Sequence, residues 1–154
     1  MMRKFVKQSV VMAPVEKVFA FHDRPEAIID LTPPWAGMTL VQPATNGLQI
    51  GSRVILKVKM GPFTKTWVAE HTEYELNRMF ADVQREGPFS YWYHRHLFEG
   101  KSDNSTLMTD EIEYKLPMGS LGDLCGHGIV ENQLRRSFDY RHRIVADKMK
   151  LLLS

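Results

Sequence analysis

Residues 79–98 read MFADVQREGPFSYWYHRHLF, two alternating runs with Glu86-Gly87-Pro88 between them. A period of two is typical of half-buried β-strands, and Gly-Pro between two such runs indicates a turn, so we predict an antiparallel hairpin here. Alternate side chains of a strand point to opposite faces. One face of the second strand carries Trp92, His94, His96 and Phe98. We expect this face to be buried, because the other face would place Arg95 inside.

Similar alternation continues on both sides of this hairpin. We expect strands over Lys4–Met12, Met38–Gln42, residues 53–60, Phe63–Tyr74, Met79–Arg85, Phe89–Glu99 and Ser105–Leu116. Short turns, including Asn46-Gly47 and Gly61-Pro62, separate neighbouring strands. Consecutive strands joined in this way indicate an antiparallel meander.

Helical spacing replaces the alternation in three places. Pro14 suits the first turn of a helix, and the apolar spacing over residues 15–22 predicts a short helix. A second short helix is expected over Glu26–Asp30, and a long one from about Val130 to Leu152. One face of the long helix carries Leu134, Phe138, Val145, Met149 and Leu152. Glycine disfavours helix interiors, so Gly122–Gly128 is left open as a loop or a loosely ordered helical turn.

Together these elements predict an α+β fold. A curved antiparallel sheet of about seven strands is expected to wrap around the long C-terminal helix, with two short helices after the first strand. The long helix is the only element able to cover the apolar concave face of the sheet. A sheet wrapped on one helix often leaves a cavity between them, a usual place for an apolar ligand.

Composition restricts the class of protein. Of the 154 residues, 44% are hydrophobic and 25% charged, which is typical of one globular domain over residues 1–154 and excludes a disordered chain. The net charge is only +2, so no nucleic-acid partner is expected. Cys125 is the single cysteine, and an unpaired thiol favours a reducing, cytoplasmic location. We expect neither a signal peptide nor an integral membrane segment, because the required apolar stretches are absent.

Two motifs resemble a known superfamily. Ala13–Phe19 reads APVEKVF after a predicted strand and resembles the AP-x-E-x-V-[FW] start of the START-like helix-grip superfamily (SRPBCC). This group includes polyketide cyclase/dehydrase, lipid-transfer and coenzyme Q-binding proteins. A second segment, Phe80–Phe98, resembles a pattern in an uncharacterised bacterial branch. The resemblance implies a helix-grip fold over essentially the whole chain, but this fold hosts carriers, cyclases and regulators alike.

Polar side chains join the aromatic ones on the expected inner face. The candidate catalytic residues are His94 and His96 as general acid and base, with Asp82 or Asp110 fixing the imidazole tautomer. The sheet contributes the candidate ligand-binding residues Trp67, His71, Phe80, Gln84, Trp92, Phe98 and Met108. The long helix contributes Leu134, Phe138 and Val145.

Three interpretations of this cluster stay open. The histidines and carboxylates pair with one another across neighbouring strands, as buried polar groups require; or they orient the polar group of an apolar ligand; or they transfer protons. His-x-His with a carboxylate on an adjacent strand is also able to hold zinc, with His71 as a third ligand. Since no cysteine pair or helical H-E-x-x-H accompanies these residues, we expect neither a metal nor another cofactor.

The favoured function is binding of a small, largely hydrophobic molecule in the cavity between sheet and helix. The ligand is expected to be aromatic or polyketide-, lipid- or quinone-like. One alternative is a cyclase or dehydratase that uses the pocket histidines, and another is a regulatory module that acts through protein contact. The basic residues from Arg135 to Lys150 are expected to form a solvated helix face, with weak contact to a membrane surface or an acidic partner as the alternative. The sequence does not indicate an oligomeric state.

Overall fold

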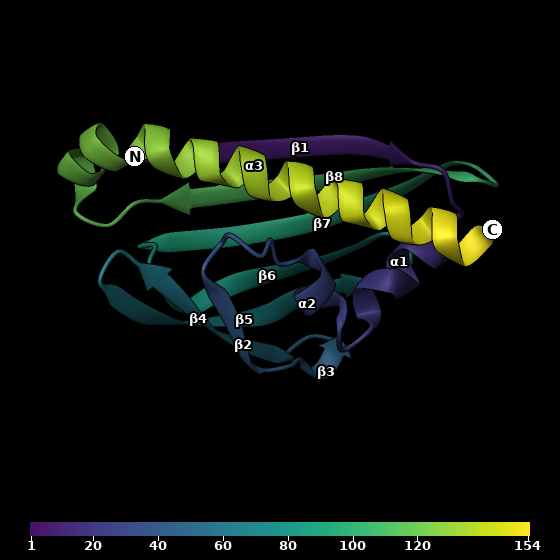
Figure 1. Cartoon of the computed structure of the whole chain (residues 1–154), viewed down its shortest axis with the longest axis horizontal. Coiled ribbons are helices and arrows are strands. Elements are labelled where there is room, and N and C mark those ends of the chain that lie inside the picture. Colours follow the sequence, from purple (N-terminus) through teal and green to yellow (C-terminus); the bar gives the residue numbers. More distant parts are fainter.

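The computed structural model describes all residues, 1–154, and shows one antiparallel sheet with three helices on its inner face (Figure 1). The strands are β1 (Arg3–Val11), β2 (Met38–Gln42), β3 (Thr45–Leu48), β4 (Arg53–Met60), β5 (Phe63–Glu75), β6 (Met79–Glu86), β7 (Tyr91–Ser102) and β8 (Ser105–Lys115). The helices are α1 (Val15–Asp23), α2 (Ala27–Leu31) and α3 (Gly119–Leu153). Seven strands form the sheet in the order β1-β8-β7-β6-β5-β4-β2. The predicted α+β helix-grip fold is confirmed.

The predicted inner face of the central strand is also confirmed. From Tyr91 to Phe98 of β7 the side chains alternate, and Trp92, His94, His96 and Phe98 are the buried ones. Arg95 lies on the outer face, where it forms an ion pair with Glu111 of β8 at 2.6 Å. Because the histidine face is buried, Arg95 lies on the more solvated face, where a carboxylate pairs with it.

The Asn46-Gly47 segment differs from the prediction of a simple turn. Residues 45–48 form the short strand β3, which does not belong to the seven-strand order. The backbone amide of Leu48 donates a hydrogen bond to Oδ1 of Asp23 at the end of α1, over 3.0 Å. Gly47 has a φ of 53°, and a Cβ there would lie 2.6 Å from the same Asp23 oxygen. Contact with α1 thus determines the conformation of this segment.

The last helix is longer than its sequence indicates. α3 begins at Gly119 rather than near Val130, so the Gly122–Gly128 stretch is helical. The 35 residues of α3 span about 52 Å at 1.5 Å per residue. The carboxylate of Asp123 forms ion pairs with the N-terminal amine at 2.9 Å and with Arg3 at 3.2 Å. Such tertiary contacts outweigh the low helix propensity of the glycines.

The helices cover different parts of the inner face. α3 runs along the β1 and β8 side of the sheet, and α1 and α2 lie beside its C-terminal half (Figure 1). A first core cluster contains Val11, Ala13, Val18, Phe19, Phe21, Leu31, Leu48, Phe80, Phe98, Met108, Val145 and Met149. A second contains Trp92, Ile112, Tyr114, Leu116, Leu134 and Phe138. None of the helices combines the length and apolar character that crossing a bilayer requires.

Candidate functional site

A cluster of histidines and aspartates lies on the inner face of three adjacent strands. Asp82 of β6 stands directly opposite His94 of β7, and His96 of β7 stands opposite Asp110 of β8. The side chains of His94, His96 and Asp110 are each at most 8% exposed, and that of Asp82 is 13% exposed. The strand register therefore brings two carboxylates to either side of two imidazoles.

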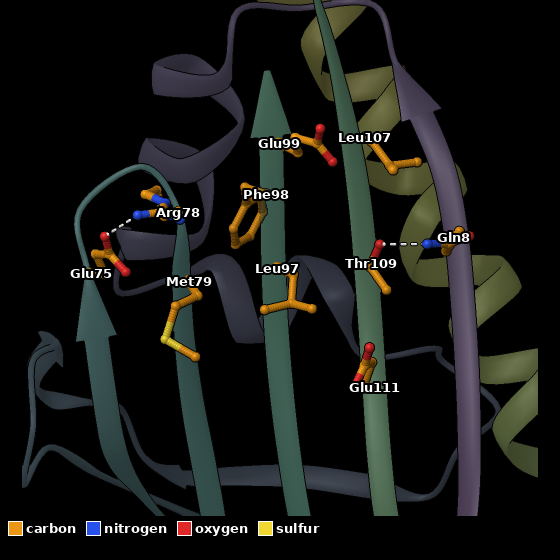
Figure 2. A pocket seen from close by; sticks show the side chains of 10 residues that line it. All are labelled: Gln8, Glu75, Arg78, Met79, Leu97, Phe98, Glu99, Leu107, Thr109 and Glu111. Carbon is orange, nitrogen blue, oxygen red and sulfur yellow. Dashed lines mark hydrogen bonds and ion pairs between the residues drawn. The ribbon is translucent and has the colours of Figure 1, made fainter. Parts of the chain in front are cut away.

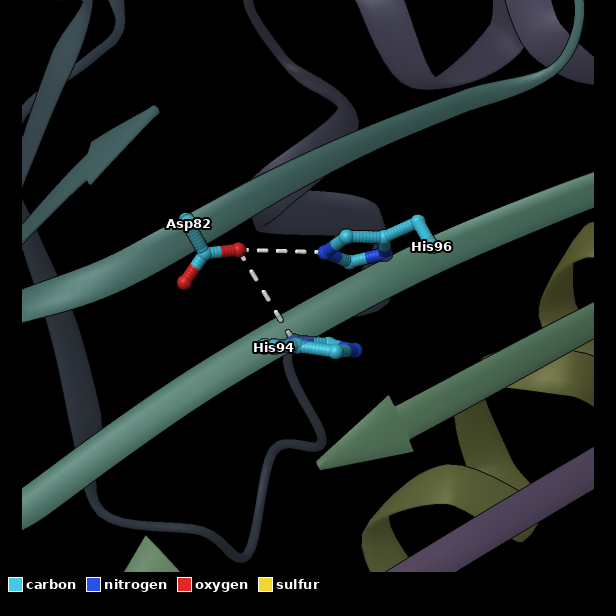
Figure 3. Close-up of side chains that lie close together, drawn as sticks. All are labelled: Asp82, His94 and His96. Carbon is cyan, nitrogen blue, oxygen red and sulfur yellow. Dashed lines mark hydrogen bonds and ion pairs between the residues drawn. The ribbon is translucent and has the colours of Figure 1, made fainter. Parts of the chain in front are cut away.

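Each imidazole contacts both carboxylates. His94 Nε2 forms a hydrogen bond with Oδ1 of Asp110 at 2.7 Å, and its Nδ1 lies 3.8 Å from Oδ2 of Asp82. His96 Nε2 forms a hydrogen bond with the same Asp82 oxygen at 3.1 Å, while its Nδ1 lies 3.0 Å from Oδ1 of Asp110. Figure 3 shows both imidazoles directed toward Asp82 from one strand. The histidines and carboxylates therefore pair with one another across neighbouring strands.

A third histidine, which the sequence analysis did not select, completes the cluster. His142 of α3 contacts Oδ2 of Asp110 through Nε2 at 2.7 Å, and its Nδ1 lies 2.6 Å from the Ser9 hydroxyl of β1. The signal for it was present: His142 lies four residues after Phe138, on the helix face already expected to be buried. The sequence also places His142 between Arg141 and Arg143, in a basic run that favours a solvated helix face.

Burial and hydrogen bonding shift the pKa values of the cluster in different directions. Burial, with a contribution from His96, lowers the pKa of His94 to about 4. Burial opposes protonation of His96 as well, but the two carboxylates outweigh it and raise its pKa. Burial alone would raise the pKa of Asp110, yet hydrogen bonds from His142, His94 and His96 hold it well below the usual range. Burial would likewise raise the pKa of Asp82, but contacts with His96 and His94 lower it. The cluster therefore favours ionised carboxylates, and it favours the neutral form of His94 more strongly than that of His96.

Aromatic rings enclose the two central imidazoles. Phe80 stacks on His96 with ring centroids 4.0 Å apart, and Phe138 of α3 meets His94 edge-on at 5.3 Å. Trp92 also meets His94 edge-on, at 6.1 Å. This apolar surrounding limits access of water and strengthens the interactions among the charged groups.

A second aromatic group extends from Trp92 toward β5. Trp92 and Trp67 lie edge to face at 5.0 Å, and Phe89 packs against them at 4.8 Å and 5.7 Å. We call Trp67, Phe89 and Trp92 the aromatic wall. Trp92 is buried, whereas Trp67 and Phe89 are only half-buried. Phe89 was not among the predicted ligand-binding residues, although it precedes the alternating run of β7.

Comparison with known proteins places this fold in a family. Residues 11–141 match the family described as polyketide cyclase / dehydrase and lipid transport. The chain belongs to this family. The START-like resemblance of the sequence motifs is thereby confirmed. No curated protein matches the sequence of this family member.

Solved structures share the fold of this polyketide cyclase/dehydrase family member at low sequence identity. The aromatase/cyclase Zhui from Streptomyces sp. R1128 superposes with a TM-score of 0.79 at 14% identity, over 100% of this chain and 97% of that one. A Thalictrum flavum norcoclaurine synthase mutant superposes with a TM-score of 0.77 at 11% identity, over 100% and 98%. A START superfamily protein from Mycobacterium smegmatis gives 0.69 at 13% identity, over 97% and 98%.

The predicted ligand-binding residues of this family member lie in three different environments. Phe80, Phe98, Met108 and Val145 belong to the core cluster that packs under α1 and the C-terminal part of α3. Trp92, Leu134 and Phe138 belong to the second cluster, against which the half-buried Trp67 packs. His71 and Gln84 are the two polar members, and they differ in their partners.

The Gln84 side chain forms hydrogen bonds with the backbone, whereas one ring nitrogen of His71 lacks a hydrogen-bond partner. The Gln84 side chain donates to the carbonyl of Phe89 at 2.8 Å and accepts from its amide at 3.2 Å. These bonds close the turn at Gly87-Pro88 between β6 and β7. His71 of β5 is buried opposite Asp82, and its Nδ1 has no hydrogen-bond partner in the protein. Burial lowers the pKa of His71, so its neutral form is favoured.

Two hollows on the surface of this family member lie away from the cluster. Figure 2 shows the first, of about 390 Å³, lined mainly by outward-facing residues such as Met79, Leu97 and Thr109. The second, of about 320 Å³, is formed by α2 and β2 and the segment between them. Neither lies between the sheet and α3, so a ligand cavity there stays a prediction.

Proposed function

We propose that the chain binds a small, largely apolar molecule with one polar group, between the aromatic wall and the histidine–aspartate cluster. The observation that carries the proposal is the position of Trp92. Its ring contacts Trp67 on one side, at 5.0 Å, and His94 on the other, at 6.1 Å. An apolar surface and a polar group thus meet at one residue, which is the usual composition of a small-molecule site.

The aromatic wall supplies apolar surface that the protein itself leaves partly uncovered. Trp67 and Phe89 pack against the second core cluster but are only half-buried. A bound ring covering them would remove further apolar area from water, and edge-to-face or offset contacts among aromatic rings add about 0.5–1.5 kcal/mol per pair. This arrangement favours an aromatic or polycyclic ligand body.

The unpartnered nitrogen of His71 supplies the polar contact. A buried polar atom without a partner costs about 1–3 kcal/mol, which a hydrogen bond from a ligand hydroxyl would remove. The neutral imidazole is both donor and acceptor, so it suits a hydroxyl or a carbonyl. Membership of a family that includes lipid transport supports the same class of ligand.

Fluorescence titration tests the proposal. The three tryptophans are Trp35, Trp67 and Trp92, and two of them belong to the aromatic wall. Titration with 1-anilinonaphthalene-8-sulfonate and with a panel of hydroxylated polycyclic ketones should give saturable, stoichiometric quenching. Trp67→Ala should weaken binding about tenfold, while Tyr91→Ala, on the outer side of β7, should not. Equal affinity of both variants, or no saturable binding by the folded protein, would contradict the proposal.

A second candidate function is acid–base catalysis on such a ligand. It is favoured by the two imidazole–carboxylate pairs, His94 with Asp110 at 2.7 Å and His96 with Asp82 at 3.1 Å. A carboxylate that orients an imidazole is a common arrangement for removing a proton beside a carbonyl and donating one to a leaving oxygen. Product formation from a polyketide or hydroxyketone panel, abolished in His94→Gln with binding retained, would support this function. Binding without turnover across the panel favours the carrier.

A further inference from the structure

We propose that Asp82, His94 and His96 form a binding site for a divalent transition-metal ion, with Asp110 as the residue that orients both imidazoles. The three side chains come from two paired strands, β6 and β7, and each offers a ligand atom within 4.8 Å of the others. Figure 3 shows them converging on the space beside Asp82. This proposal does not depend on the identity of the organic ligand.

The distances suit tetrahedral coordination. Zinc binds nitrogen and carboxylate oxygen at about 2.0–2.2 Å, so two ligand atoms of one tetrahedron are about 3.3–3.5 Å apart. Oδ2 of Asp82 lies 3.1 Å from Nε2 of His96 and 3.8 Å from Nδ1 of His94. These two distances lie on either side of the required value. All three ligand atoms lie within 4.8 Å of one another, so side-chain adjustment would place them around one ion.

Asp110 defines which nitrogens are free to bind. It contacts Nε2 of His94 at 2.7 Å and Nδ1 of His96 at 3.0 Å, both through Oδ1. A proton on each of these nitrogens makes the opposite nitrogens, the ones that face Asp82, the metal ligands. The ion would displace the proton that Nε2 of His96 donates to Asp82. Metal-binding histidines commonly donate their second N–H to a carboxylate in this way. His142 and Ser9 in turn hold Asp110 and the imidazole of His142.

The charge of the cluster also favours a cation. Asp82 and Asp110 are two deeply buried carboxylates, and neither forms an ion pair with a lysine or arginine. Their only ion-pair partners are histidines. Buried charges require compensation, and a divalent ion that displaces the His96 proton would balance both carboxylates. The ligand set of two nitrogens and one oxygen suits zinc, cobalt or iron(II) better than magnesium or calcium.

His71, which the sequence offers as a third ligand, does not belong to this group of three residues. With three protein ligands the ion keeps at least one free position, as catalytic zinc sites do. This position would be available to water or to the polar group of a bound ligand. The site is thus compatible with the proposed carrier function and does not require it.

Metal uptake by the purified protein tests the inference directly. The chain is treated with a chelator, dialysed against zinc at pH 7.5, and analysed for metal content. We expect one zinc per chain and, with cobalt(II), the visible absorption bands of a tetrahedral site. In spectra of the histidine ring nitrogens, zinc should shift Nδ1 of His94 and Nε2 of His96, and leave those of the half-exposed His127 unchanged. The spectra require no variant, so they remain informative if a variant fails to fold.

Variants separate this site from adventitious binding. Asp82→Asn and His96→Gln should each abolish stoichiometric uptake, and Asp110→Asn should weaken the affinity about 10–100-fold. His127→Gln on α3 is the matched control and should bind zinc as the unaltered chain does. No uptake by the folded chain, or equal uptake by Asp82→Asn and His127→Gln, would overturn the inference. The fluorescence titration of the metal-free protein is independent, so failure of one proposal is distinguishable from failure of the other.

Discussion

His142 of α3 and Asp110 of β8 are joined through Nε2 and Oδ2 at 2.7 Å, although 32 positions separate them in the chain. Both side chains are nearly fully buried. The contact therefore connects the long helix to the centre of the sheet through a polar group rather than through apolar packing alone. Because Asp110 also contacts His94 and His96, docking of α3 and the geometry of the cluster depend on each other.

Removing His142 should therefore destabilise the whole fold. His142→Ala leaves Asp110 with fewer partners and opens a cavity under α3, for which we expect a loss of about 2–4 kcal/mol in the free energy of unfolding. Urea denaturation followed by circular dichroism measures it. The control His127→Ala, at a half-exposed position of the same helix, should change it by less than about 0.5 kcal/mol. Similar losses for the two variants would contradict the role of the buried pair.

Phe98 and Trp67 were both predicted as ligand-binding residues, but the structure assigns them different roles. Phe98 packs against Phe19 of α1 at 5.3 Å and is 5% exposed. Phe98→Ala should cost about 3–5 kcal/mol of stability, since it creates a cavity in the first core cluster. Trp67→Leu, at a half-buried position, should cost clearly less and affect ligand affinity instead. Denaturation and fluorescence titration of both variants measure the two effects, and the reverse ranking would contradict this assignment.

His22 should make the protein less stable in acid. Its Nδ1–H donates to the carbonyl of Val18 at 2.8 Å, and its ring lies against Phe98 at 5.0 Å. Burial lowers the pKa of His22 from 6.5 to about 3. The folded pKa lies below the unfolded one, so this contribution is fully present above pH 6.5 and is lost as the pH falls from 6.5 toward 3.

The difference between the unaltered chain and His22→Gln isolates this contribution. Below pH 6.5 the difference in the free energy of unfolding between the two chains should shrink by up to about 1.4 kcal/mol per pH unit. This is the value for one additional proton bound by the unfolded chain. Urea denaturation at pH 7.5, 6.5 and 5.5 measures it. A difference that stays constant over this range would show that His22 does not titrate with folding.

Two glycines of α3 should respond in opposite directions to alanine. A Cβ on Gly122 would lie 1.9 Å from the carbonyl oxygen of Pro117, whereas one on Gly128 meets nothing within 4 Å. Gly128→Ala should stabilise the chain by about 0.5–1 kcal/mol through helix propensity, and Gly122→Ala should destabilise it by displacing the first turn. Thermal unfolding compares them, and hydrogen exchange of residues 119–126 should increase only in Gly122→Ala. Stabilisation by both substitutions would argue against the close approach at Pro117.

The sequence predicts much of the candidate site because strands have a simple period. Alternation places His94 and His96 on one face with Trp92, and Asp82 and Asp110 on the same inner face of other strands; these four lie together in the structure. The choice of the inner face followed from the cost of burying Arg95. Alternation and the cost of an unpaired buried charge are local properties, which one strand reveals without its neighbours.

His142 and Phe89 could not be assigned in the same way. From the helical pattern alone, His142 also fits a basic, solvated run. Only the docking of α3 against β1 and β8 places it next to Asp110. Phe89 joins Trp67 because the Gln84 side chain holds the preceding turn in place. Both contacts join residues on different elements, so no period along one element contains them.

The sequence by itself determined the type and order of nearly all elements, the inner face of β7 and the sheet residues of the polar cluster, because these depend on side-chain periods and turn residues. Only the tertiary structure decided that each imidazole lies between two carboxylates, that α3 begins at Gly119 and that a helix histidine completes the cluster. These depend on distances between elements remote in sequence, which packing and buried hydrogen bonds determine when the sheet and α3 close on each other.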